Sequence, residues 1–282
     1  MRGLLILGSI VMVAASAVRS EDNLTKCADT LGVSRVAEVD TTGGALFGNQ
    51  YPPTTLLQKG EVVLTFDDGP HPTYTKQILE ALAAQCTKAT FFNVGEMVKQ
   101  YPDVAREVEA EGHTIGTHTW SHPNLAALSL ETATKQVESA FSIEDQTLNH
   151  GVAPFFRFPY LSDAQSVRKY LARRSIAAFS IDVDSSDWRT KSPDRIVANV
   201  RNGLLKSGGG IILFHDIHEQ TARALPRVLK ELKEHNFKVV QLVPKAPVES
   251  IAIGEPAIEE AHRAAMHSRR YAHSHHKRDS VI

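Results

Sequence analysis

Residues Glu61–Pro72 read EVVLTFDDGPHP, an apolar run that ends abruptly in two adjacent carboxylates and a turn. Val62–Phe66 is almost wholly apolar, which is typical of a strand buried on both faces, and Gly69-Pro70 then ends the strand. Asp67 and Asp68 therefore lie at a strand end, where neighbouring carboxylates repel each other unless a cation or a proton divides their roles. By itself Asp67-Asp68-Gly69-Pro70 is also typical of a solvated turn. The rest of the chain has to decide between a turn of this kind and a chemical site.

Further apolar runs of strand length follow along the chain, at Ala89–Val94, His113–Gly116, Phe155–Phe158, Ile176–Ile181, Gly210–Phe214 and Phe237–Leu242. Segments with helical spacing separate them, at Thr75–Ala84, Pro102–Glu111, Leu130–Leu148, Ala164–Arg174, Pro193–Lys206 and Glu219–His235. This alternation predicts a mainly parallel sheet covered on its outer face by helices. About seven strands without a GxGxxG turn favour a closed or nearly closed α/β barrel over a doubly wound sheet, with the active site at the carboxyl ends of the strands.

The composition is that of an ordinary soluble globular protein. Of the 282 residues, 42% are apolar and 22% are charged, and the formal net charge is -1. This length fits one large α/β domain, to which we assign residues 61–244. Because basic residues are not in excess, we expect no nucleic-acid partner.

Residues 1–20 have the pattern of a signal peptide. Arg2 precedes the almost uninterrupted apolar run Leu4–Ala15, and Ala15-Ser16-Ala17 has the small-x-small form of a signal-peptidase site. A membrane anchor is the alternative, but the run is short for a span and Arg19 follows it closely. We therefore expect export to the periplasm, the cell wall or the medium, with no stable membrane span after cleavage.

Two segments flank the predicted domain. Residues 21–60 contain several turn residues and are expected to form an irregular arm. Residues 245–282 are rich in His and Arg without a sustained apolar stripe, which predicts a flexible tail; a metal-binding or wall-binding tail is the alternative. In an oxidising compartment Cys27 and Cys86 would form a disulfide between arm and domain, and the alternative is two free thiols.

Chemically active side chains follow the apolar runs one after another. They are Asp67 and Asp68 after the first run, His118 and His122 after the third, Arg157 within the fourth, Asp184, Asp187 and Trp188 after the fifth, and His215 with Asp216 after the sixth. All strands of a parallel barrel end at the same face, so these distant segments are expected to converge on one site.

The segment His118–His122, HTWSH, spaces two imidazoles at i and i+4, as on one side of a helical turn. Both can then reach one divalent cation. A lone HxxxH pattern is weak evidence for a metal. Two histidines with one aspartate, however, form a common catalytic ligand set that leaves positions open for water and substrate.

Five short motifs now stand in a fixed order: TFDDG at Thr65–Gly69, HTWSH at His118–His122, RFPY at Arg157–Tyr160, DSSDW at Asp184–Trp188 and LFH at Leu213–His215. Together they resemble the ordered motifs of the polysaccharide deacetylase family, the NodB-homology domain of carbohydrate esterase family 4, over residues 61–243. The resemblance implies a distorted (β/α) barrel and metal-dependent hydrolysis of an N-acetyl group on a sugar.

The resemblance also implies which residues hold the metal and activate water. Asp68, His118 and His122 would bind a divalent metal, Zn²⁺ in first place, with Co²⁺, Ni²⁺ or Mn²⁺ as alternatives. Asp67 would be the general base. Arg157 would pair with Asp67 and keep it ionised at neutral pH, because an opposite charge favours the charged form.

The remaining roles concern the leaving amine and the substrate pocket. His215 would be the general acid and Asp187 its partner, which raises the pKa of the ring and orients it. The backbone N–H of Tyr160 would face the developing oxyanion. The residues implied to contact substrate are Pro159, Tyr160, Trp188 and Leu213. Pro159 also has a purely structural interpretation, because its ring would rigidify the turn that presents Tyr160.

The function expected from these residues is removal of N-acetyl groups from a GlcNAc-containing polysaccharide, namely peptidoglycan, chitin or its oligomers, or an exopolysaccharide. A metal-dependent O-acetyl esterase acting on a polysaccharide such as xylan is the alternative, because both reactions need the same water, metal and acid. A carbohydrate-binding protein without turnover would lack the base, the acid or the ligands, and all of them are present.

Overall fold

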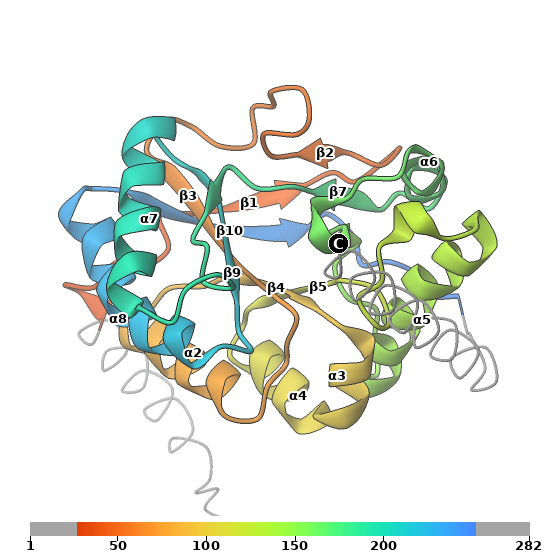
Figure 1. Ribbon diagram of the computed structural model, residues 1–282, viewed down its shortest axis with the longest axis horizontal. Helices are drawn as coiled ribbons and strands as arrows, with labels where there is room; N and C mark the ends of the chain where they lie inside the picture. The colour runs from red at the N-terminus through yellow and green to blue at the C-terminus, as the bar shows by residue number, and fades with distance from the viewer. Residues whose placement is uncertain (1–26, 252–282) are drawn as a thin grey trace, which may run out of the picture.

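The computed structural model describes residues 27–251 (Figure 1). The predicted signal peptide at 1–20 and residues 252–282 of the predicted tail lie outside the described residues. Within the described part, helices surround a curved sheet on three sides in the view of Figure 1, and β1 (Arg35–Val39), β2 (Leu46–Phe47) and the segment after β2 form the remaining side.

A ten-stranded sheet forms the centre of the fold, and its recorded strand pairs are all parallel. After β1 and β2, its strands are β3 (Glu61–Asp67), β4 (Thr90–Asn93), β5 (Thr114–Thr117), β6 (Phe155–Phe156), β7 (Ala177–Phe179), β8 (Val183–Asp184), β9 (Gly210–His215) and β10 (Lys238–Pro244). The path β1-β10-β3-β4-β5-β6-β7-β2 carries β9 and β8 as a branch from β3. The predicted parallel (β/α) fold is confirmed, but the described strands do not close into a complete barrel.

Strand β3 is the centre of this topology, as the EVVLTFD sequence predicts. It pairs with β9 along Val62–Asp67 on one edge. On its other edge it pairs first with β10, at Glu61 and Val62, and then with β4, at Thr65–Asp67. All seven residues of β3 are buried, because helices cover one face and the inside of the curved sheet covers the other.

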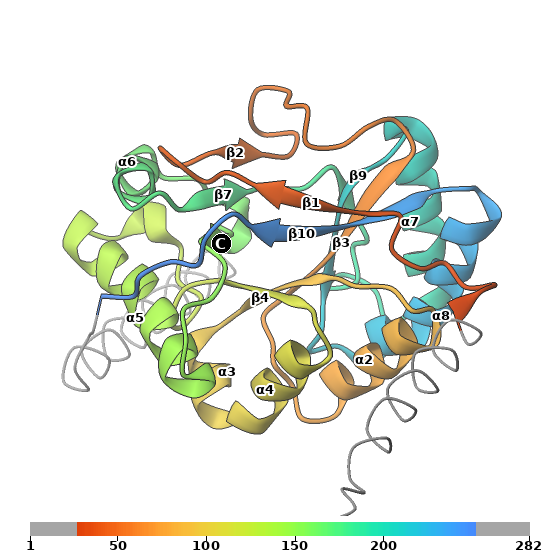
Figure 2. The ribbon, with the colours of Figure 1, turned by 180° about the vertical axis from the view of Figure 1, so that it is seen from behind.

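The helices pack on the outer face of the sheet (Figures 1 and 2). They are α2 (Tyr74–Ala84), α3 (Gly95–Gln100), α4 (Pro102–Ala110), α5 (Leu130–Leu148), α6 (Gln165–Arg173), α7 (Pro193–Ser207) and α8 (Glu219–Glu234). Local sequence fixes the ends of the longer ones. Ser129 and Ser192 cap the N-termini of α5 and α7 through their hydroxyls, and Asn149 and Gly208 end the same helices in the left-handed conformation.

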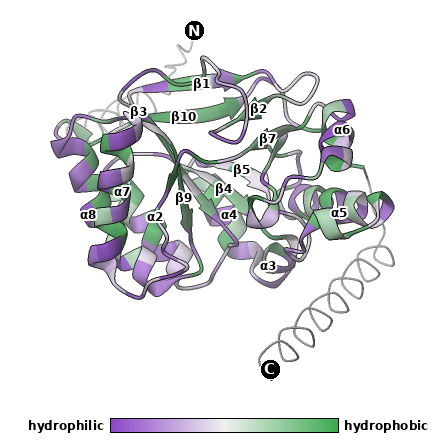
Figure 3. Cartoon of the chain, turned by 45° about the horizontal axis from the view of Figure 1, so that its top comes forward, coloured by the Kyte–Doolittle hydropathy of each residue, from purple (hydrophilic) through white to green (hydrophobic). Residues whose placement is uncertain are grey.

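Alternating residues of the strands divide the core into two clusters. Val62, Leu64 and Phe66 belong to the larger cluster between sheet and helices, whereas Val63 belongs to a smaller cluster inside the sheet, together with Phe92. Figure 3 shows the corresponding distribution, with hydrophobic residues on the strands and hydrophilic residues on the outward faces of α7 and α8. Successive side chains of a strand point to opposite faces of the sheet, and both faces are apolar here, as expected for a parallel sheet.

Several expectations need correction. The segment 21–60 is not simply irregular, because β1 pairs with β10 and β2 pairs with β7. The sheet has ten strands rather than about seven. The two-residue strands β2 and β8 were missed because they are too short to show a period, and β1 was missed because its partner strand lies about 200 residues away. The short helix α3 was not predicted either. Among residues 27–251, no helix is both long and apolar enough to cross a membrane.

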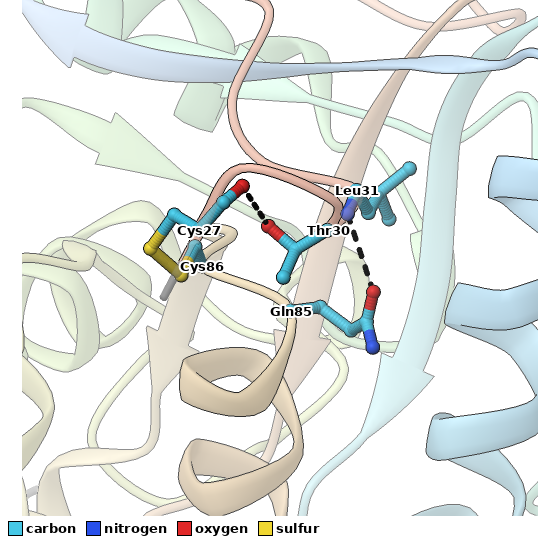
Figure 4. Close-up of a disulfide and its surroundings, with 5 residues drawn as sticks. All are labelled: Cys27, Thr30, Leu31, Gln85 and Cys86. Carbon is cyan, nitrogen blue, oxygen red and sulfur yellow. Dashed lines mark hydrogen bonds between the residues drawn. A yellow bond between two sulfur atoms is a disulfide. The ribbon is translucent and has the colours of Figure 1, made fainter. Parts of the chain in front are cut away.

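Cys27 and Cys86 form a disulfide, which joins the start of the described chain to the residue that follows the C-cap of α2 (Figure 4). Their Cα atoms are 5.8 Å apart and the two residues are 59 positions apart in the sequence. Around the disulfide, Thr30 Oγ1 donates to Cys27 O at 3.0 Å, and Leu31 N donates to Gln85 Oε1 at 3.2 Å. The predicted covalent link between arm and domain is present.

Replacing Cys27 and Cys86 together with serine is expected to lower the free energy of unfolding by about 2–4 kcal/mol, because the link restricts a long loop of the unfolded chain. Urea denaturation of the oxidised protein and of the double variant measures the difference. Reductant should bring the parent protein to the stability of the variant and leave the variant unchanged. Equal stability of the oxidised parent and the variant would contradict the expectation.

Candidate active site

The parallel strands bring the predicted residues together at their carboxyl ends. Asp67 is the last residue of β3 and His215 the last residue of β9, and the two are register partners on neighbouring strands. A cavity of about 330 Å³ lies at these strand ends. It is lined by Asp67, Asp68, His118, His122, Phe158, Tyr160, Leu161, Asp184, Trp188, Leu213 and His215.

Asp68, His118 and His122 form a compact group of candidate metal ligands, with ligand atoms within 4.8 Å of one another. Asp68 Oδ1 lies 3.7 Å from His118 Nε2 and 3.4 Å from His122 Nε2. His118 Nδ1 donates to the carbonyl of Arg157 at 2.7 Å, so its Nε2 is the nitrogen left to bind a cation. Burial lowers the pKa of His118 well below its usual value, which keeps the ring in the neutral, ligating form.

The two histidines converge for a different reason from the predicted one. Residues 118–122 form an irregular loop rather than a helical turn. Thr119 and His122 have φ values of 71° and 57°, and Thr119 Oγ1 accepts a hydrogen bond from His122 N at 3.0 Å. The first N–H groups of α3, those of Gly95 and Glu96, donate to the carbonyls of Thr119 and Trp120. The loop is thus bent by left-handed residues and held by a helix N-terminus.

Asp67 is buried against Arg157, whose side chain is completely inaccessible to solvent. Arg157 Nη1 donates to Asp67 Oδ1 at 2.7 Å and to Thr65 Oγ1 at 2.8 Å. The guanidinium also donates to the carbonyls of Phe179 and Ser180 and lies over the ring of Phe92. Arg157 therefore stands behind the cavity and presents Asp67 to it.

The electrostatics of Asp67 differ from the expectation in direction. Burial raises the pKa of the Asp67 carboxyl to about 6, and the positive charge of Arg157 only limits that rise. The group is still mostly ionised at pH 7. A carboxylate with a pKa near the working pH is a better proton acceptor than one with its ordinary pKa near 4.

His215 and the buried Asp187 form a second pair, on the β9 side of Asp67. His215 Nδ1 donates to Asp187 Oδ1 at 2.7 Å, and His215 N donates to Asp187 Oδ2 at 2.7 Å. Thr221 Oγ1 donates to the same Oδ2 at 2.6 Å. Burial by itself lowers the pKa of His215, but the hydrogen bond and charge of Asp187 outweigh it and raise the pKa to about 9.

Aromatic and aliphatic side chains form the rest of the cavity wall. Tyr160 and Trp188 are 67% and 56% exposed, so their rings stand at the rim, whereas Leu213 is buried at the base. Tyr160 has a left-handed backbone (φ 59°) and its hydroxyl donates to the carbonyl of His122 at 3.3 Å. Pro159 does not line the cavity: it is buried at the start of the turn that carries Tyr160, where its structural interpretation fits.

Three residues that line the cavity were given no role from the sequence: Phe158, Leu161 and Asp184. Phe158 and Leu161 flank the Pro159-Tyr160 dipeptide. Their position next to this dipeptide could have indicated that they line the cavity, because a turn that brings Tyr160 to a cavity also brings the residues that flank it. Asp184 was expected among the side chains that converge on the site, and it lines the cavity, but no chemical role was given to it.

Comparison with known proteins gives one family and several named relatives. The sequence model of the polysaccharide deacetylase family matches residues 56–178. The peptidoglycan-N-acetylglucosamine deacetylase of Bacillus cereus is 35% identical over 189 residues, which cover 65% of this chain and 67% of that protein. The peptidoglycan-N-acetylmuramic acid deacetylase PdaC of Bacillus subtilis is 35% identical over 180 residues, or 64% of this chain, but the match spans only 37% of that longer protein.

A solved structure has the same fold. The Bdellovibrio bacteriovorus peptidoglycan deacetylase Bd3279 superposes with a TM-score of 0.70 at 28% sequence identity. The match covers 84% of this chain and 72% of that one. The similarity thus extends over most of the residues that the structure describes.

Replacing Arg157 with methionine is expected to lower the free energy of unfolding of the metal-free protein by about 3–5 kcal/mol, because it leaves Asp67 charged and unpaired in the interior. The loss should shrink as the pH falls, since Asp67 can then be buried as the neutral acid. Urea denaturation at pH 7 and pH 5 measures both effects.

The matched control is Arg189→Met, which removes a guanidinium that lies over the exposed ring of Trp188. This change should have only a small effect on stability. Similar losses for the two variants would contradict the importance of the buried ion pair.

Proposed function

The chain belongs to the polysaccharide deacetylase family, and on this premise we propose that it is a metal-dependent hydrolase that removes N-acetyl groups from a GlcNAc-containing polysaccharide. The observation that supports the proposal most strongly is the arrangement around Asp67. A carboxylate with a pKa near 6 and an imidazole with a pKa near 9 end adjacent strands, beside a cluster of two histidines and an aspartate.

The residues present fit a divalent cation. Asp68 Oδ1 is buried and makes no hydrogen bond within the described residues, which leaves a charged oxygen for a metal to satisfy. Together with the Nε2 atoms of His118 and His122, it forms the His₂Asp donor set suited to Zn²⁺, Co²⁺, Ni²⁺ or Mn²⁺. When bound, such a cation polarises a carbonyl and makes water a stronger acid.

Asp67 takes the proton from the attacking water. The water oxygen bonds to the acetyl carbonyl carbon as its proton moves to a carboxylate oxygen of Asp67. Arg157 holds Asp67 Oδ1, so Oδ2, which lies 3.7 Å from His118 Nε2, faces the ligand cluster. The backbone N–H of Tyr160 is the proposed donor to the developing oxyanion, a contribution of about 3–4 kcal/mol in comparable sites.

His215 gives its proton to the leaving amine. Because Asp187 binds Nδ1, the proton delivered is the one on Nε2, and the C–N bond breaks as the nitrogen accepts it. The products are acetate and a free amino sugar. Leu213 and Trp188 would surround the acetyl methyl group, and Tyr160 and Trp188 offer exposed rings to the sugar.

The polymer and the place of action are part of the same proposal. The relatives described above are named for peptidoglycan, so a cell-wall glycan is the first substrate to test, followed by chitin oligomers. The signal-like residues 1–20 support export to the compartment where such polymers lie.

Acetate release by the purified protein tests the function. Peptidoglycan or N-acetylglucosamine oligomers should yield acetate with added Zn²⁺, and a chelator should abolish it. Release from an O-acetylated xylan alone would overturn the proposal in favour of an esterase, and no release from any of these substrates would also contradict it.

Two variants separate the base from the ligands. Asp67→Asn should lower kcat by orders of magnitude while the protein still binds one metal ion, because Asp68 rather than Asp67 is the proposed ligand. His118→Ala should lose metal affinity as well as activity. Loss of stoichiometric metal in Asp67→Asn would contradict this division of roles.

The pH profile should be bell-shaped. Activity should fall at acid pH, where Asp67 becomes protonated, and at alkaline pH, where His215 loses its proton. In the metal-free protein the two pKa values are about 6 and about 9, and the charge of a bound cation would lower both. In Asp187→Asn the group that raises the pKa of His215 is gone, so the alkaline limb of kcat should move to lower pH. An unchanged alkaline limb in this variant would show that another group is the acid.

A further inference from the structure

We propose that Asp216 is a positioning residue whose buried carboxylate fixes the turn of residues 67–71 and thereby sets the place of Asp68 in the metal site. None of the five motifs includes Asp216, and the mechanism above gives it no role. The inference rests on the metal site of the proposed function and goes one step further, to what holds one of its ligands.

Asp216 is anchored to the end of β3 by its own backbone. It follows β9 directly, and its N–H donates to the carbonyl of Asp67 at 3.2 Å. The residue is completely buried. Its carboxylate therefore lies behind the turn that begins at Asp67, on the side away from solvent.

The carboxylate packs directly on the backbone of Gly69. A Cβ atom at position 69 would lie 2.0 Å from Asp216 Oδ2 and 2.4 Å from Oδ1, far inside contact distance. Only glycine fits there, and it is the residue that follows the proposed ligand Asp68. The two sequence motifs TFDDG and LFH, far apart in the chain, thus interlock through a residue just outside the second motif.

The far end of the turn is held through Thr75, in the first turn of α2. Thr75 Oγ1 donates to Asp216 Oδ2 at 2.5 Å and accepts a hydrogen bond from His71 N at 2.7 Å. In the middle of the turn, Val94 N donates to the carbonyl of Gly69 at 3.0 Å. Asp216 therefore connects to both ends of the turn.

Asp68 needs such support because its backbone is in an unfavourable region. Its φ is 78°, which is uncommon for a residue other than glycine and persists only where surrounding contacts enforce it. The position of Asp68 Oδ1 between His118 and His122 depends on this conformation. Loss of the contacts beneath Gly69 would let the turn relax and displace the ligand oxygen.

Burial of Asp216 is energetically unfavourable in itself. Its Oδ1 has no hydrogen-bond partner among the described residues, and burial raises the pKa of the carboxyl to about 7. A buried polar atom without a partner calls for an explanation other than packing, and a positioning role supplies one.

The metal-free protein is titrated with Zn²⁺ against a chromophoric chelator to measure its Zn²⁺ affinity. Urea denaturation measures its stability. Asp216→Ala and Thr75→Val should weaken Zn²⁺ binding by about 10–100-fold, the range seen when the partners of metal ligands are removed. Asp216→Asn keeps an acceptor for Thr75 and should retain most of the affinity. Thr75→Val preserves shape, so it remains informative if Asp216→Ala folds poorly.

Asp182→Ala is the matched control. Asp182 Oδ2 accepts a hydrogen bond from Ile211 N at 2.8 Å, at the opposite end of the same strand β9. This variant should lose stability without a change in Zn²⁺ affinity. Unchanged Zn²⁺ affinity in folded Asp216→Ala and Thr75→Val would overturn the proposal. A parent protein that binds Zn²⁺ but releases no acetate would refute the proposed function while leaving this test intact.

Discussion

The buried ion pair between Arg157 and Asp67 is the interaction on which the other parts of the site depend. The guanidinium holds Asp67 at the end of β3 and also donates to two carbonyls at the end of β7, those of Phe179 and Ser180. The main-chain carbonyl of Arg157 accepts a hydrogen bond from the ring of His118. One residue thus orients both the proposed base and a proposed metal ligand. Because Arg157 is withdrawn from solvent and Asp67 is only 2% exposed, bulk water is a poor substitute for either partner of the pair.

The distribution of charge around this pair explains why a cation suits the site. Four carboxylates, those of Asp67, Asp68, Asp187 and Asp216, are wholly or largely buried near the strand ends, and Arg157 is the one fully buried guanidinium among the described residues. His215 compensates Asp187 when it is protonated. A divalent ion between Asp68 and the two histidines would supply much of the positive charge that the protein itself leaves out.

Sequence reasoning found the parts of the site that depend on strand ends. Asp67 and Asp68 follow an apolar run and His215 ends another, so a parallel sheet necessarily brings them together. It did not find the path of the HTWSH loop, in which Thr119 and His122 are left-handed. The loop accepts hydrogen bonds from the N-terminus of α3, far from the motif in the chain, and one from His122 N to Thr119 Oγ1 within the motif. The burial of Asp216 likewise depends on packing that no local pattern records.

The register of β3 against β9 has a consequence for how the protein reaches its native state. Asp67 and His215 become neighbours only after a parallel strand pair closes across about 150 residues, a non-local contact of the kind that slows folding. The metal ligands, by contrast, all lie between β3 and the loop after β5. A folding chain therefore gathers its ligand residues from one short stretch, whereas the pairing of proton acceptor and proton donor awaits the last third of the sequence.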